Sequence, residues 1–182
     1  MNRAELELAI ATAARIVRQD RVLVIGSQSI LGSYPEDVLP ARATLSHEVD
    51  IAPLRDDEQE SLATLIDAAA GEWSPFDEEH GFYIQGVGVR TAFLPSGWAE
   101  RVVVVETAEG SIGLCLDPHD LCAAKLGRND IKDREFVDAL IGASLIDPAV
   151  LLERFDAIGD ERLAEARRAV VRAFLRAYPA RS

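Results

Sequence analysis

Apolar and polar residues follow two different spacings along this 182-residue chain. Near the N-terminus, apolar residues recur every three or four positions, which predicts an amphipathic helix over residues 3–18. Its apolar stripe consists of Leu6, Ile10, Ala13 and Val17. Elsewhere, short apolar or alternating runs are bounded by Gly, Pro and Ser, and this pattern predicts strands. We expect strands at residues 21–25, 46–54, 82–85, 101–106 and 112–116.

Helix signals dominate the second half of the chain. Asp117-Pro118 and Asp147-Pro148 each place a capping acid before a proline, so we expect a helix to begin at each pair. Asp160 is expected to cap the last helix, whose apolar stripe is Leu163, Ala166, Val170 and Phe174. Earlier in the chain we expect a short helix at residues 27–33, a loop at 34–45 and a helix at 57–72.

These elements together predict an α/β (α+β) fold, in which a small mixed sheet is followed by a helical C-terminal half. A chain of 182 residues fits one domain of this kind. We therefore place a core in residues 1–117 and a helical part, packed on that core, in residues 118–182, within one structural domain.

The charge of the chain bears on its partners. The net charge is −12, from 19 basic and 31 acidic residues. Proteins that bind long nucleic-acid duplexes use basic stripes, so we expect a small substrate, a short nucleic-acid end or a protein partner instead. No run of about 18 apolar residues predicts a membrane span. The first residues, MNRAELELAI, lack the order of a signal peptide, so we expect a cytoplasmic location.

The two cysteines, Cys115 and Cys122, are too few for a disulfide scaffold. Both lie in apolar surroundings, which indicates buried small side chains. A cysteine hydrolase would need one of them beside His47, His80 or His119, and no sequence order supports such a pair. The spacing typical of a zinc site is also missing.

The segment around Glu48 and Asp50 is the most informative for chemistry. Alternate residues of a strand share a face, so both carboxylates point to one side, roughly 7 Å apart along the strand. Like charges at that separation repel unless a cation lies between them, and oxygen-rich pairs suit Mg²⁺ or Mn²⁺. The alternative is an exposed strand with one polar face.

Two further segments carry candidate binding residues. The turn that contains Gly26 and Ser27 follows a predicted strand and precedes a short helix, an arrangement that favours close approach of an anion. Lys125, Arg128 and Lys132 are spaced three and four residues apart, so they share a face if one helix continues through them. A break at Asn129-Asp130 would start a new helix instead. The simpler interpretations are a structural turn and a solvated charged face.

These three segments together resemble the nucleotidyltransferase-fold proteins related to AbiE-type (type IV) toxins, and within them an uncharacterised branch labelled only as a domain of unknown function. Members of that superfamily carry a Gly-Ser turn after the first strand and an acid-x-acid pair on the next, here Gly26-Ser27 and Glu48/Asp50. In this branch a later stretch reads D-L-x-x-x-K-L-x-R-x-x-x-K-D, and residues 120–133 are similar to it. Residues 94–98 also resemble the branch.

The resemblance, which covers most of residues 20–145, implies metal-dependent transfer of a nucleotidyl group from a nucleoside triphosphate to an unknown acceptor, which is RNA, protein or a small molecule. It implies Mg²⁺ or Mn²⁺ as cofactor, with Glu48 and Asp50 as metal ligands and catalytic carboxylates. Lys125 is the further catalytic residue that it implies, with Asp133 in support as the partner of a nearby cation. The residues implied for nucleotide binding are Gly26, Ser27, Ser29, Arg128 and Lys132.

The chain departs from the superfamily pattern in two ways. Twenty residues lie between Ser27 and Glu48, a longer gap than is usual. Active members use a third acid on a later strand, and the best candidate here is Glu106, at the end of the predicted strand 101–106. With two acids alone, the alternative is a non-catalytic nucleotidyltransferase-like binding module, or one component of a toxin–antitoxin pair.

Overall fold

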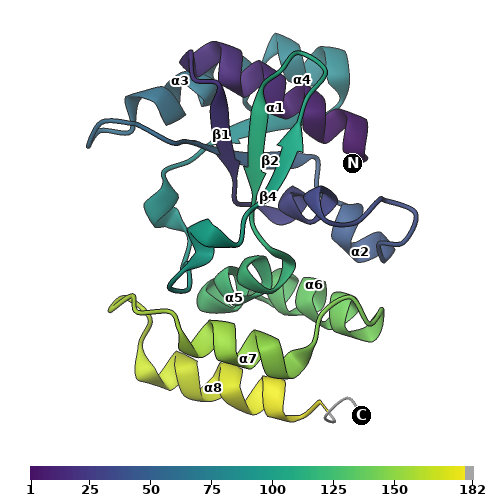
Figure 1. Cartoon of the computed structure of the whole chain (residues 1–182), viewed down its shortest axis with the longest axis vertical. Coiled ribbons are helices and arrows are strands. Elements are labelled where there is room, and N and C mark those ends of the chain that lie inside the picture. The colour runs from purple at the N-terminus through teal and green to yellow at the C-terminus, as the bar shows by residue number, and fades with distance from the viewer. Residues whose placement is uncertain (179–182) are drawn as a thin grey trace.

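A five-stranded mixed sheet forms the upper part of the molecule in the computed structural model, which describes residues 1–178 (Figure 1). The strands follow the order β3-β2-β1-β5-β4 across the sheet. All five strands predicted from the sequence are present, and none of their ends is shifted by more than two residues. Their bounds are β1 Arg21–Val24, β2 Glu48–Pro53, β3 Tyr83–Gly86, β4 Val103–Glu106 and β5 Ile112–Cys115.

The strand directions decide which residues meet at each end of the sheet. β1 runs antiparallel to β2, so that Val24 at the end of β1 lies opposite Ile51 of β2. β5 runs parallel to β1, and β3 runs parallel to β2. The carboxyl ends of β1 and β5 therefore meet the amino end of β2, where Glu48 and Asp50 lie.

Two helices cover one face of the sheet, α1 Arg3–Val17 and α3 Ser61–Ala70. A Cβ added to Gly113 of β5 would meet the side chain of Ile10 in α1, and one added to Gly86 of β3 would meet the α3 backbone. Val49 and Ile51 of β2 are completely buried in the core. Because side chains alternate along a strand, Glu48 and Asp50, which alternate with them, face the opposite side.

Four helices form the lower part of the molecule (Figure 1): α5 Pro118–Arg128, α6 Ile131–Gly142, α7 Pro148–Asp156 and α8 Glu165–Arg176. Asp117 and Asp147 cap α5 and α7 through bonds from first-turn N–H groups, as the Asp-Pro pairs predicted. Asn129 ends α5 in the left-handed conformation, with φ 63°, and α6 begins two residues later. A mixed sheet followed by a helical C-terminal half confirms the predicted fold class.

Differences from the prediction are concentrated in the connections of the first half. Residues 27–33 form η1, a 3-10 helix at Ser27–Gly32, and residues 34–45 contain one helical turn, α2 Ala41–Thr44. The helix predicted from residue 57 begins only at Ser61, because the carboxylates of Asp56 and Asp57 accept bonds from the following backbone N–H groups and hold a turn. A further helix, α4 Pro75–His80, was not predicted.

The last helix also differs from its prediction. α8 begins after Ala164, and Asp160 pairs instead with Arg162 in the preceding turn. Of the predicted stripe, Leu163 is buried but precedes the helix and Phe174 is half-buried, whereas Ala166 and Val170 are exposed. The buried residues of α8 are Val171 and Leu175 instead. Asp160 Oδ1 also accepts a hydrogen bond from the Arg162 backbone N–H, and local side-chain to backbone bonds of this kind compete with helix structure.

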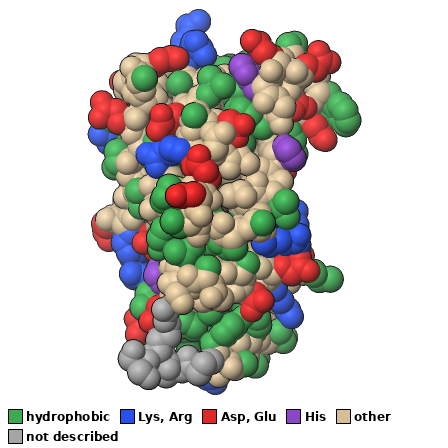
Figure 2. Space-filling view, turned by 90° about the vertical axis from the view of Figure 1, so that its right-hand side faces the viewer, with side chains coloured by type: hydrophobic (Ala, Val, Ile, Leu, Met, Phe, Trp, Pro, Cys, Tyr) green, Lys and Arg blue, Asp and Glu red, His purple; other side chains and the backbone are tan. Residues whose placement is uncertain are grey.

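Charged side chains are mixed over the surface. On the face that Figure 2 shows, basic side chains lie in small separate groups among acidic ones. Within residues 1–178, no helix is both long enough and apolar enough to cross a membrane.

Candidate active site

Glu48 and Asp50 face a cleft between the sheet and α5. The backbone N–H of Ile25 donates to the Asp50 carbonyl at 3.1 Å, which ties the end of β1 to the acidic start of β2. Two adjoining cavities, of about 260 and 360 Å³, share Glu48, Asp50, Lys125 and Arg128 in their walls. Because both cavities share these four side chains, they are two halves of one cleft.

Gly26, directly after β1, lies against the Asp50 carboxylate. A Cβ at position 26 would lie 1.7 Å from Asp50 Oδ2, far inside any allowed contact. The backbone of Gly26 is extended, with φ −86° and ψ −172°, a conformation open to any residue. Glycine is therefore required here by the close approach of Asp50 and not by backbone conformation.

The two carboxylates are coupled to each other. Burial, followed by the charge and hydrogen bonding of Glu48, raises the pKa of Asp50 from 3.8 to about 7. Tyr83 of β3 donates its hydroxyl proton to Glu48 Oε2 at 3.0 Å. Burial and the neighbouring Glu48 raise the pKa of Tyr83 to about 12, so the phenol stays a donor at neutral pH. A crowded acidic pair of this kind is stabilised by a cation.

The opposite wall of the cleft is basic and is organised by Asp133. This carboxylate is completely buried and accepts bonds from Lys125 Nζ at 3.3 Å and from Arg128 Nη2 at 2.9 Å. Lys125 is 7% exposed, and its Nζ lies 4.7 Å from the centroid of the Phe136 ring. Burial lowers the pKa of Lys125, while the charges of Asp133 and Asp50 raise it. Asp133 thus holds both cations facing the acidic pair.

The two halves of the cleft differ in the charge of the residues that line only one of them. One half, which we call the neutral half, is completed by uncharged residues of β3 and the segment after it: Gln85, Val87, Thr91 and Ala92. The other, the charged half, is completed mainly by residues of η1, α2 and α6: Ser27, Arg42, Lys132, Asp133 and Phe136. The cleft therefore offers an anionic group a charged end and an uncharged group a neutral end.

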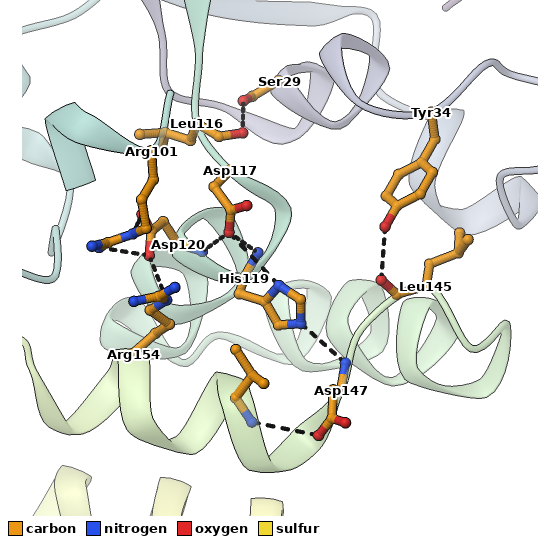
Figure 3. A network of polar contacts seen from close by, with 11 residues as sticks. Ser29, Tyr34, Arg101, Leu116, Asp117, His119, Asp120, Leu145, Asp147 and Arg154 are labelled. Carbon is orange, nitrogen blue, oxygen red and sulfur yellow. Dashed lines mark hydrogen bonds and ion pairs between the residues drawn. The ribbon is translucent and has the colours of Figure 1, made fainter. Parts of the chain in front are cut away.

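A buried ionic network anchors α5, the helix that carries the basic wall (Figure 3). Asp120 is completely buried and accepts bonds from Arg101 Nε at 2.8 Å and Nη2 at 3.1 Å. Arg154 Nε of α7 lies 3.5 Å from the same carboxylate. His119 Nε2 accepts a bond from the Asp147 N–H at 3.1 Å. These contacts fix α5 against α7 and against the segment before β4.

Most of the predicted site residues line this cleft: Gly26, Ser27, Glu48, Asp50, Lys125, Arg128, Lys132 and Asp133. Ser29 does not, because it is completely buried and its hydroxyl donates to the Leu116 carbonyl. Glu106 pairs with Ile112 at the start of β5, which is the end of the sheet away from the cleft. The structure therefore places Ser29 in the core and Glu106 at the far end of the sheet, and neither residue joins the cleft.

The two thiols are buried and lie outside this cleft. Burial raises the pKa of Cys115 to about 12 and also raises the pKa of Cys122. Both thiols therefore stay protonated at neutral pH, which is unfavourable for a nucleophilic cysteine.

Sequence reasoning missed Arg42, Tyr83, Gln85 and Thr91. Tyr83 and Gln85 alternate along a predicted strand and so share a face, which was a usable signal. The pairing of that strand with β2, which brings Gln85 beside Asp50, could not be read from one sequence. Arg42 was hidden in a segment predicted as a loop.

The donor set limits how a metal could be held. Among residues 1–178, no three His, Cys, Asp or Glu side chains are grouped as metal ligands. A pair of carboxylates fits Mg²⁺ or Mn²⁺ that completes its coordination with water and substrate phosphates. Glu48 and Asp50 match that requirement.

Comparison with known proteins bears on this cleft. No curated protein and no solved structure matches the chain significantly. The family described as "Nucleotidyltransferase of unknown function (DUF6036)" matches residues 4–179. A relationship to AbiE-type toxins is not part of that description and stays a prediction. Since the match spans nearly the whole sequence, the chain belongs to this family of nucleotidyltransferases of unknown function.

Proposed function

We propose that the protein transfers a nucleotidyl group from a nucleoside triphosphate to a hydroxyl group of an acceptor, with Mg²⁺ or Mn²⁺ as cofactor. The observation that carries this proposal is the half-buried acidic pair, Glu48 and Asp50, facing the basic side chains of α5 across one cleft. Membership of a nucleotidyltransferase family supports it.

Different side chains of the cleft bind the cation and the phosphates. Glu48 and Asp50 hold the cation, which when bound supplies charge that offsets the phosphate oxygens. Lys125 and Arg128 neutralise the phosphates from the opposite wall, and Asp133 keeps both in place. Preorganised charges of this kind stabilise charge that develops during the reaction.

The reaction is a displacement at phosphorus. An acceptor hydroxyl oxygen bonds to the α-phosphorus, and the bond from the α-phosphorus to the oxygen that bridges to the β-phosphorus breaks. Pyrophosphate leaves with the electrons of that bond, and the hydroxyl proton passes to water. Arg42, which is ion-paired with Glu135, and the exposed Lys132 add two basic side chains to the charged half, which suits the pyrophosphate. The neutral half then takes the acceptor, whether RNA, protein or a small molecule.

Labelled nucleotides test this function. The protein is incubated with Mg²⁺, total RNA or lysate, and each nucleoside triphosphate labelled at either the α- or the γ-phosphate. We expect the α-label to enter a product while pyrophosphate is released, and Asp50→Asn to abolish both. Transfer of the γ-label alone would show phosphoryl transfer and contradict the proposal.

A non-catalytic binding module is the second candidate, because among the described residues no third carboxylate is grouped with Glu48 and Asp50 as a metal ligand. Such a module would bind nucleotide with the metal but release no pyrophosphate. A stable complex with a protein partner and no turnover would favour it, as for one component of a toxin–antitoxin pair. Pyrophosphate release that depends on Asp50 would exclude it.

A further inference from the structure

Gln85 occupies a distinctive place in the cleft. In the parallel pairing of β3 with β2, Gln85 lies opposite Asp50 and Tyr83 lies opposite Glu48. Tyr83 donates a hydrogen bond to its partner at 3.0 Å. Gln85 lines the same cavity as both carboxylates, and its side-chain amide makes no hydrogen bond to another described residue. A polar group is thus presented to the cleft beside the acidic pair.

Apart from Glu48 and Asp50, the charged side chains of the cleft are poor candidates for a cation ligand. Lys125 and Arg128 are cations themselves and would repel one. Asp133 is the remaining carboxylate of the walls, but its oxygens already accept bonds from those two side chains. Mg²⁺ and Mn²⁺ prefer oxygen ligands, and an amide oxygen is one that they accept. The position of Gln85 therefore matches that of a third, neutral ligand.

We infer that Gln85 is the third protein ligand for the divalent cation, and that this neutral ligand makes cation binding depend on the nucleotide. The inference rests on the proposed function. Two carboxylates and one amide offset the charge of the cation itself but not its repulsion from Lys125 and Arg128, which share only the carboxylate of Asp133, so the free protein holds it weakly. The phosphates of a bound nucleotide supply the missing negative charge and oxygen ligands. Cation and nucleotide then bind cooperatively, each raising the affinity of the protein for the other.

Substitution of Gln85 by glutamate tests this directly, because glutamate has the same shape and adds one negative charge. Mn²⁺ is titrated into the protein without nucleotide, and the free ion is followed by its electron paramagnetic resonance signal. We expect Gln85→Glu to bind Mn²⁺ at least tenfold more tightly than the parent. Adding Asp50→Asn to it should remove the gain. Gln19→Glu is the matched control, since Gln19 lies beside Arg55, outside the cleft.

The same titration is repeated with a non-hydrolysable nucleoside triphosphate. The parent should bind Mn²⁺ at least tenfold more tightly with nucleotide than without, and Gln85→Ala should reduce this cooperativity several-fold. Melting temperatures confirm that each variant is folded. If the parent is cooperative but neither substitution changes Mn²⁺ binding relative to Gln19→Glu, the role of Gln85 is refuted and the proposed function stands. If the parent shows no cooperativity at all, the proposed function itself fails.

Discussion

Replacing Asp50 by asparagine should stabilise the protein at high pH and leave its stability nearly unchanged at low pH. The pKa of Asp50 is raised from 3.8 to about 7, first by burial and then by Glu48. A raised carboxyl pKa means that the fold favours the protonated form. The ionised form therefore costs folding free energy, and this cost appears as pH rises from about 4 to above 7. Asparagine is neutral at every pH and avoids the cost.

The size of the stability gain follows from the shift in the pKa of Asp50. Three pKa units at about 1.4 kcal/mol per unit give an upper limit of about 4 kcal/mol. Because the carboxylate lines an open cleft, water screens part of this cost, and we expect a gain of about 2 kcal/mol at pH 8.5. The assay is urea unfolding between pH 4 and 8.5 in the presence of a chelator. Saturating Mg²⁺ should also raise the stability of the parent at pH 8.5, because the cation offsets the repulsion.

Asp37→Asn is the control, since Asp37 lies exposed in the loop before α2. It removes the same charge from an acidic protein and should change stability by less than about 0.5 kcal/mol at either pH. If Asp50→Asn gains no more than Asp37→Asn at pH 8.5, or gains equally at pH 4, the crowding of the acidic pair is not as the structure indicates.

Three further substitutions test the walls of the cleft. Gly26→Ala places a methyl group in the position of the Asp50 carboxylate. The substitution should lower stability by about 1–3 kcal/mol, and calorimetry should show that Mg²⁺-nucleotide binding is weakened at least tenfold. Lys125→Ala should lower both the stability of the fold and the affinity for nucleotide by about 1–3 kcal/mol. Lys132 is exposed, so Lys132→Ala should change stability by less than about 0.5 kcal/mol and should weaken nucleotide binding less. Equal stability losses in the two variants would mean that the buried position of Lys125 is wrong. Asp120→Asn leaves two arginines without their buried partner and should cost about 2–4 kcal/mol in urea unfolding, and an unchanged midpoint would count against the anchoring of α5.

The sheet was predictable because each of its strands carries a local signal. The alternation at residues 46–54 depends on the period of a strand alone, and Glu48 and Asp50 do line the same cleft. The Asp-Pro pairs likewise predicted the starts of α5 and α7 from local capping. These features depend on residues that are close together in the chain, so a single sequence is enough to predict them.

At the site, the differences from the prediction concern contacts between distant residues. Glu106 was suggested by its place at the end of a strand, but the antiparallel pairing of β4 with β5 takes it to the far end of the sheet. Ser29 lies two residues from Ser27, yet it turns into the core and bonds to Leu116. Gln85 became visible as a site residue only through the pairing of β3 with β2. Strand order and packing are decided by the whole chain, so local patterns could not supply them.

Isothermal titration calorimetry with a non-hydrolysable nucleoside triphosphate tests the central claim most directly, which is that Glu48 and Asp50 couple a divalent cation to nucleotide binding. The titration is made in Mg²⁺ and again in a chelator, for the parent and for Asp50→Asn. We predict that the parent binds nucleotide at least tenfold more tightly in Mg²⁺ and that Asp50→Asn loses this difference while keeping its fold. Equal affinity of the parent for nucleotide in Mg²⁺ and in chelator would contradict the account.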